Sequence, residues 1–313
     1  MAAVFVSVLR APGASVAAGL DGSRAAVHHR RMTSFAVLQA STLVELLTAR
    51  LPSMKRGTLK DRLRDGCVLV NGAVVRRATT PVAPGDTVEL RREGQRAPQT
   101  GRVPILHVDR ELVVVDKPSG LLSVGAGRGD DKTVLALVGA QLKGGERLFP
   151  CHRLDQGTSG VLLLPRTPEV QHFFFEHWGE TQKTYVALVE GRMQDEAGTV
   201  RAALYEDPRS LAVSVRDGPD ARDAVTHFRV LARRARCTLV EIDLETGRKH
   251  QIRVHLRHLG HPVLGDDRYG DGALAPRLCL HARELTFPHQ RTGERLTFSA
   301  PVPSLFAELL SRG

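Results

Sequence analysis

The residues best suited to chemistry lie in one polar string, His152-Arg153-Leu154-Asp155-Gln156-Gly157-Thr158-Ser159-Gly160, which runs directly into an apolar stretch at 161–164. This pattern predicts a glycine-containing loop that presents the carboxylate of Asp155 just ahead of a buried strand. Such a carboxylate can serve as a nucleophile or as a charge stabiliser. A loop aspartate more often hydrogen-bonds nearby backbone amides, so Asp155 alone leaves both interpretations open.

A second run of polar residues, at 247–256, could supply the partner of that carboxylate. Its spacing predicts a helix starting near Arg248, with a buried face made of Ile252, Leu256 and Leu259. Arg253 and Arg257 lie on an adjacent face, available to a cleft. Because a guanidinium stabilises the ionised form of a buried carboxylate, we expect Arg253 to pair with Asp155. Without a supporting motif, a solvated arginine pair would be the simpler interpretation.

Two hydrolase interpretations fit the residues poorly. Four histidines crowd one stretch, at His250, His255, His258 and His261. Their spacings lack the i, i+4 pair of His-Glu-x-x-His, and no carboxylate base lies between them, so a metal site is not expected. The run Gly157-Thr158-Ser159-Gly160 is not the Gly-x-Ser-x-Gly motif of a serine hydrolase either.

The strand-like runs in this part of the chain predict the sheet that must position these side chains. They fall at 105–108, 112–115, 181–190, 240–244, 278–287 and 295–299. They do not alternate strictly with crossover helices. We therefore predict an α+β fold with a mixed, largely antiparallel sheet and a central cleft.

A smaller unit is predicted ahead of it, over residues 41–92. Thr42 and Glu45 form a capping box, and Asn71-Gly72 is a strong hairpin signal. A second helix is expected to start at Thr58 and to bury Leu59 and Leu63. Three basic residues on this helix, spaced four apart, make a stripe suited to phosphate: Arg56, Lys60 and Arg64.

The charge of the chain is concentrated near its start. The net charge is +10, and residues 1–103 hold 16 Lys/Arg against 7 Asp/Glu. This asymmetry favours a polyanion-binding attachment on a near-neutral body, although a solvated basic surface would look the same in composition. No apolar run approaches the ~20 residues of a membrane span, so no membrane partner is expected. The four cysteines form no Cys-x-x-Cys pair, which favours a reducing compartment.

Two resemblances draw these features together. Part of the N-terminal unit resembles the alpha-L RNA-binding module. The matching residues are 59–63, the run Asp65-Gly66-Cys67-Val68-Leu69-Val70-Asn71-Gly72, and Pro84-Gly85-Asp86. The string His-Arg-Leu-Asp-x-x-Thr-Ser-Gly resembles the signature of RluA-type pseudouridine synthases. Further stretches similar to that family's motifs occur in the same order along the chain, ahead of this string at 109–122 and after it at 183–185, 247–256 and 258–266. One departure is Lys249, where a threonine is commoner.

The second resemblance implies isomerisation of uridine to pseudouridine in structured RNA, without a cofactor or a metal. It nominates Asp155 as the nucleophile, Tyr185 as a base or a wall against the uracil ring, and Arg253 as the partner of Asp155. Arg153 would fill the stack that a flipped base vacates. His152 and Lys117 are nominated as further RNA contacts.

The same resemblance implies an RNA partner, with ribosomal RNA favoured over transfer RNA. The alternative is a catalytically idle RNA-binding or ribosome-assembly factor. We expect a disordered arm at 1–34, the alpha-L module at 35–93, a linker at 94–103 and the catalytic domain at 104–313. A monomer in the bacterial cytoplasm is expected, or an organellar protein if residues 1–31 are a transit peptide.

Overall fold

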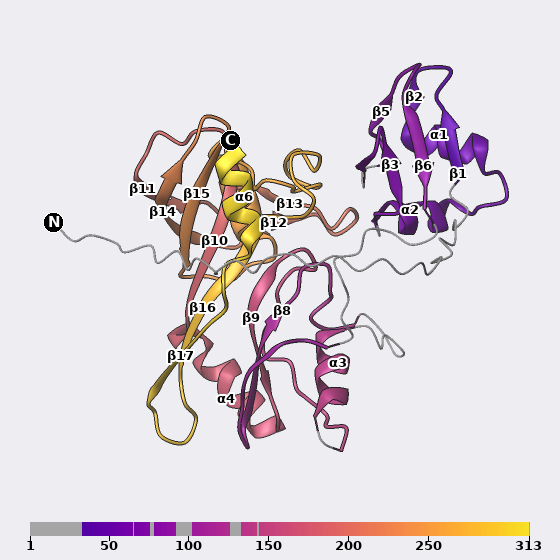
Figure 1. Ribbon diagram of the computed structural model, residues 1–313. Coiled ribbons are helices and arrows are strands. Elements are labelled where there is room, and N and C mark those ends of the chain that lie inside the picture. Colours follow the sequence, from indigo (N-terminus) through magenta and orange to yellow (C-terminus); the bar gives the residue numbers. More distant parts are fainter. Residues whose placement is uncertain are drawn as a thin grey trace, which may run out of the picture. The chain divides into compact units, whose positions relative to one another are not determined.

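The computed structural model describes residues 33–64, 66–75, 78–91, 102–125, 133–142 and 144–312 (Figure 1). Residues 1–32 of the predicted arm and residues 94–101 of the predicted linker lie outside this part of the chain. Strand β1 begins at Thr33, so the last two residues assigned to the arm belong to a sheet instead.

The N-terminal unit is a small sheet with two helices. Its four-stranded sheet has the order β1–β6–β3–β4, and a second short pair joins β2 to β5. The elements are β1 (Thr33–Ala36), β2 (Ser41–Thr42), α1 (Leu43–Arg50), α2 (Arg56–Arg64), β3 (Val68–Val70), β4 (Ala73–Val74), β5 (Pro81–Val82) and β6 (Thr87–Leu90). One apolar core, which includes Leu47, Leu59, Leu63 and Val88, joins the helices to the strands.

Most elements of this unit were predicted correctly from short sequence motifs. The capping box of Thr42 and Glu45 is present, and the β3–β4 hairpin turns at Asn71-Gly72 with φ of 50° and 81°. The predicted start of the second helix was wrong by two residues. The N–H of Leu59 donates to the carbonyl of Lys55, so helical bonding starts ahead of Thr58.

A nine-stranded sheet forms the rest of the molecule, which confirms the predicted α+β class. Its order is β11–β14–β15–β10–β16–β9–β8–β7, with β17 also paired to β16, and β9 with β16 is its parallel pair. The strands are β7 (Ile105–Val108), β8 (Leu112–Lys117), β9 (Ser159–Pro165), β10 (Gln182–Glu190), β11 (Ala197–Arg201), β14 (Val225–Arg233), β15 (Cys237–Leu244), β16 (Leu280–Pro288) and β17 (Arg295–Ser299). A separate ribbon pairs β12 (Leu204–Glu206) with β13 (Val213–Val215).

Helices cover the two ends of this sheet differently. At the β7–β8–β9 end, α3 (Val134–Gln141) packs on the face of Val113 and Leu162, whereas α4 (Pro168–His177) packs on the face of Val114 and Leu163. At the β10–β15 end, α5 (Gln251–His258) and α6 (Ser304–Arg312) join one large core with the strands. Tyr185 on β10 packs against cores of both ends, so it marks the place where they meet.

Candidate active site

The loop that carries Asp155 is fastened to the turn after β8. Ser119 Oγ donates to the carbonyl of Gly157 at 2.7 Å, and Gly120 N donates to the carbonyl of Gln156 at 2.7 Å. Ser123 Oγ both donates to the carbonyl of Leu154 and accepts from its N–H, at 2.9 and 3.0 Å. Bonds on both sides of Asp155 therefore fix its backbone.

Lys117 belongs to this fastening, and its predicted role as an RNA contact is wrong. Its side chain is 0% exposed, and Nζ donates to the carbonyls of Pro118, Leu121 and Gln156 at 3.1, 2.7 and 3.1 Å. Three acceptors match the three N–H groups of an ammonium, which leaves none for a phosphate. Burial lowers the pKa of Lys117 to about 7, against the opposing effect of the Asp155 charge.

The last residue of the nine-residue string must be glycine for a steric reason. Gly160 has a φ of +114°, and a Cβ there would lie 2.1 Å from the carbonyl oxygen of Ala282 on β16. Only glycine permits both this conformation and this approach. Gly160 therefore lets β9 pair in parallel with β16 directly after the Asp155 loop.

Arg253 joins two carboxylates. Its Nε and Nη2 donate to the two oxygens of Asp266, both at 2.7 Å, and its Nη1 donates to Oδ2 of Asp155 at 3.2 Å. Asp266 is fully buried and also accepts the N–H groups of Arg268 and Tyr269, both at 3.0 Å. The expected pairing of Arg253 with Asp155 is present, but the closer, bidentate partner is Asp266.

Asp266 is the last residue of the motif at 258–266, and no pattern in the sequence predicted a role for it. Thirteen residues separate it from Arg253, and no helical or strand spacing relates the two. The signal available was the pair Gly265-Asp266, because Gly265 has a φ of +71° and a Cβ there would lie 2.1 Å from the carbonyl oxygen of Arg277. A glycine that the backbone requires marks a turn whose next side chain is accurately placed.

The helix that carries Arg253 starts later than predicted. It begins at Gln251, because the side chain of Gln251 accepts the N–H of Arg248 at 2.9 Å and the hydroxyl of Thr246 at 2.8 Å, which holds the preceding residues in a turn. Ile252 and Leu256 are buried as predicted. Leu259 is 38% exposed, since it caps the helix just before the chain turns at Gly260.

His250 lies beside the Asp155–Arg253 pair. It has a left-handed φ of 56°, its Nε2 is 3.8 Å from Oδ1 of Asp155, and its Nδ1 is 2.7 Å from the Tyr269 hydroxyl. Burial, together with the charge of Arg253, lowers the pKa of His250. The guanidinium of Arg253 lies 5.0 Å from the centre of the Tyr269 ring. Tyr269 thus contacts both groups that face Asp155.

The other histidines of this stretch have separate partners. His255 is buried between the Thr226 hydroxyl and the carbonyl of Ala202, and His261 bonds the carbonyl of Glu190. Within the described ranges no group of three metal-ligating side chains converges. Each of these two histidines holds a backbone or hydroxyl group of the fold.

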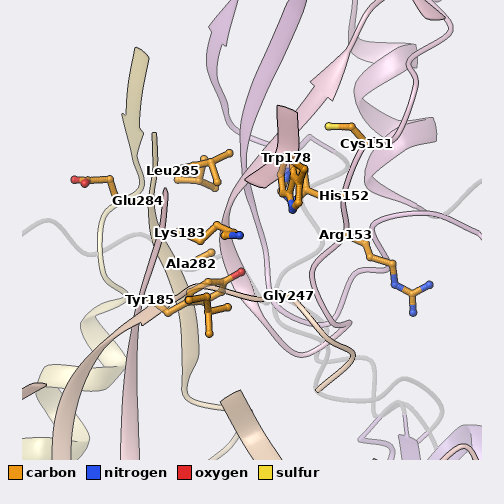
Figure 2. Close-up of a pocket in the computed structure, with 12 residues that line it drawn as sticks. Cys151, His152, Arg153, Trp178, Lys183, Tyr185, Gly247, Ala282, Glu284 and Leu285 are labelled. Atoms are coloured by element: carbon orange, nitrogen blue, oxygen red, sulfur yellow. The ribbon is translucent and has the colours of Figure 1, made fainter. Parts of the chain in front are cut away.

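A pocket of about 220 Å³ opens between β10, β16 and the start of the polar loop (Figure 2). This volume is smaller than the ~300–1,000 Å³ typical of pockets for drug-sized ligands, so the pocket suits a single planar base. Twelve residues line it: Cys151, His152, Arg153, Val161, Trp178, Lys183, Tyr185, Leu244, Gly247, Ala282, Glu284 and Leu285. Asp155 itself, with its side chain 21% exposed, lies outside this set.

Tyr185 and His152 present uncharged groups to the pocket. Burial, together with the charge of Asp155, raises the pKa of Tyr185, so its hydroxyl stays protonated. Burial lowers the pKa of His152 to about 3, and its Nε2 accepts the N–H of Leu163 at 2.9 Å. His152 is therefore a neutral anchor of the loop that stacks on Trp178, and its expected contact with RNA stays a prediction.

The remaining basic residues of the prediction differ in their positions. Arg153 is exposed at the rim of the pocket, and Figure 2 shows its guanidinium directed away from Tyr185. Arg56, Lys60 and Arg64 lie on α2 as predicted, but their side chains fall outside the described residues. Lys249, the departure from the family pattern, pairs with Glu206 and does not line the pocket.

Comparison with known proteins identifies the class of this fold and site. Residues 111–258 match the family described as RNA pseudouridylate synthase. This range includes the Asp155 loop, Tyr185 and Arg253, and it ends at the close of α5.

Relatives and solved structures agree with this match. The chain is 36% identical to a ribosomal large subunit pseudouridine synthase D of Xanthomonas campestris, over 85% of this chain and 87% of the relative. It is 37% identical to an uncharacterised RNA pseudouridine synthase of Bacillus subtilis, over 66% and 71%. The structure of human RNA pseudouridylate synthase domain containing 4 is similar, with a TM-score of 0.55 and 32% identity, over 67% of this chain and 92% of that one. The chain therefore belongs to the RluA-type RNA pseudouridine synthases, which are isomerases that act on RNA.

Proposed function

We propose that this enzyme converts particular uridines of large-subunit ribosomal RNA to pseudouridine, with Asp155 as the nucleophilic carboxylate. The observation that carries the proposal is the arrangement of Asp155, which is held by Arg253 beside a base-sized pocket. The assignment to ribosomal RNA rests on relatives with that named substrate.

The reaction detaches uracil at N1 and rejoins it to the ribose through C5, so it imports no atoms and changes no oxidation state. Asp155 can form a bond to the sugar or accept a proton from it, and both routes need an ionised carboxylate close to the base. The guanidinium of Arg253 supplies a matching positive charge at 3.2 Å. Because Asp266 binds the other side of Arg253, the guanidinium is held in position before substrate binds.

Tyr185 and Arg153 have different parts in this proposal. With its raised pKa, Tyr185 serves as a wall and hydroxyl donor toward the ring, not as an ionised base. Arg153, exposed at the rim, fills the space left when uridine leaves its stack, an extrusion that costs a few kcal/mol. The N-terminal unit at 33–91 is proposed as an alpha-L module that binds RNA phosphates.

The described residues contain no helix long and apolar enough to cross a membrane. We place the enzyme in the bacterial cytoplasm as a monomer, in keeping with a ribosomal RNA substrate. A direct test incubates the purified protein with protein-free ribosomal RNA and maps pseudouridines, alongside RNA from a strain lacking the gene. A site that is formed in vitro and missing in the strain supports the proposal, whereas the absence of any such site contradicts it. The idle-factor alternative predicts that absence.

A further inference from the structure

The amine of Lys183 is an unusual group in the pocket. Lys183 lies on β10 two residues before Tyr185, is 7% exposed and lines the pocket wall. In the described part of the chain its Nζ has no hydrogen-bond or ion-pair partner. It lies over the Trp178 ring, whose centre is 5.7 Å away, in a cation–π contact. Placing an ammonium without a carboxylate partner in a largely buried side chain is costly, and no ion pair among the described residues offsets that cost.

The groups around this amine leave its charge unbalanced. His152 and Tyr185 are neutral, as described above, and burial raises the pKa of the Cys151 thiol to about 12. Glu284 also lines the pocket, but Figure 2 shows its carboxylate turned away from Lys183. Burial lowers the pKa of Lys183 accordingly. The pocket is therefore electrostatically prepared for a ligand that is negative or rich in carbonyl oxygen.

The other buried cations near the site are already engaged. Arg253 directs Nε and Nη2 to Asp266 and Nη1 to Asp155, and Lys117 directs its amine to three carbonyls. In contrast, Figure 2 shows the Lys183 amine and the Tyr185 hydroxyl extending into the same space. A base held against Tyr185 would meet this amine at its edge.

We propose that the Lys183 ammonium is a catalytic residue that binds the detached uracil and balances its negative charge while the base turns. This inference rests on the proposed function. When the C1′–N1 bond breaks, its electron pair stays on uracil, and the charge spreads over N1, O2, C5 and O4. On one route C1′ is then bonded to Asp155, and on the other Asp155 has taken the proton of the neighbouring C2′. The electron pair at C5 next forms the C1′–C5 bond, while the C1′–Asp155 bond breaks with its electron pair returning to the carboxylate, or while C2′ takes its proton back from Asp155. C5 then loses its proton, and N1 gains one. The net change is an isomerisation, and no further reactant is required.

An ammonium donor next to O2 or O4 stabilises the species that exists only between these two bond changes. Preorganised charge of this kind acts on the rate and not on the binding of the ground state. Lys183 should therefore contribute to turnover while contributing little to RNA affinity. Its unbalanced burial in the free enzyme should also lower stability, which is a common cost of active-site charges.

The test compares full-length wild type with Lys183→Met and Lys183→Arg under single-turnover conditions on a uridine-containing RNA that the wild type modifies. We expect Lys183→Met to react about 100-fold more slowly, with an unchanged Kd for the RNA and an equal or higher Tm. Lys183→Arg keeps the charge and should retain more of the rate than the methionine variant. The matched control is Lys249→Met, which removes a lysine outside the pocket and should react at the wild-type rate.

A wild-type rate in Lys183→Met would overturn the proposal. So would a slow Lys183→Met whose Tm falls, or an equal loss in the methionine and arginine variants, because either result assigns Lys183 to packing alone. Wild-type activity is measured in the same experiment and tests the proposed function separately from the role of Lys183.

Discussion

Replacing Arg253 by methionine should reveal how the site is held together. Methionine keeps much of the apolar stem but removes the guanidinium and its three carboxylate bonds. Asp266 is then left fully buried, and its remaining side-chain partners within the described residues are the N–H groups of Arg268 and Tyr269. Breaking a buried ion pair by removing one partner costs about 3–5 kcal/mol, because the remaining charge is uncompensated.

The size of this loss makes it visible in thermal unfolding. A folded unit of ~150–250 residues loses roughly 2–4 °C of Tm per kcal/mol, so Arg253→Met should melt about 6–20 °C below the wild type. Turnover should also fall strongly, since Asp155 loses its only guanidinium partner within the described residues. Differential scanning calorimetry at pH 7 and single-turnover assays at a temperature below both transitions measure the two effects.

The matched control is Arg257→Met on the same helix. Arg257 is exposed on α5, so its removal should change Tm by no more than a surface substitution does, within about 0.5 kcal/mol. If Arg253→Met melted with the wild type, the buried pair with Asp266 would not stabilise the fold. If it also turned over normally, Arg253 would have no part in positioning Asp155.

Three further perturbations test other parts of the reasoning. Asp155→Asn should abolish turnover and leave RNA affinity unchanged. It should lower the free energy of unfolding by less than about 1 kcal/mol, because Arg253 keeps its bonds to Asp266. Residual pseudouridine formation would exclude Asp155 from the mechanism. Burial lowers the pKa values of His152 and His281 to about 3 and about 4 in the folded protein. Below pH 6.5 these histidines therefore take up protons in the unfolded chain but not in the folded protein, so the free energy of unfolding decreases as the pH is lowered. From pH 6.5 to pH 5, each histidine should lower the free energy of unfolding, measured with urea, by about 2 kcal/mol. If His152→Gln showed the same pH dependence as the wild type, this reasoning would be contradicted. Deleting residues 1–98 should weaken RNA binding and flatten its salt dependence by about 0.7 in slope per lost phosphate contact; equal slopes would show that the N-terminal unit does not bind phosphate.

Local chemistry made much of the fold predictable. The capping box at Thr42 and the hairpin at Asn71-Gly72 depend on contacts within a few residues, and the strand after Ser159 is marked by its run of apolar residue types; all three are present. Element starts were less predictable. Helix α5 begins at Gln251 because its side chain bonds backbone and hydroxyl groups of the preceding turn, which no periodicity reveals.

In the candidate site, too, local sequence predicted some features and tertiary packing decided the others. The types of its residues came from motifs in the sequence, and the expected contact of Arg253 with Asp155 is present. The catalytic roles themselves remain predictions. Whether a basic residue faces solvent or the interior was decided by packing. Lys117 was expected to contact RNA, yet it is fully buried, whereas His152 lines the pocket as a neutral acceptor and its contact with RNA stays a prediction.

The sequence by itself determined the family, the α+β class and the identity of the carboxylate in the polar loop, because these depend on residue types in a fixed local order. Tertiary structure alone decided which charges compensate one another. It paired Arg253 with Asp266, enclosed Lys117 among three carbonyls, and left Lys183 unpartnered in a pocket within the described residues. The physical reason is that charge compensation depends on distance and burial, and segments far apart in the chain set both.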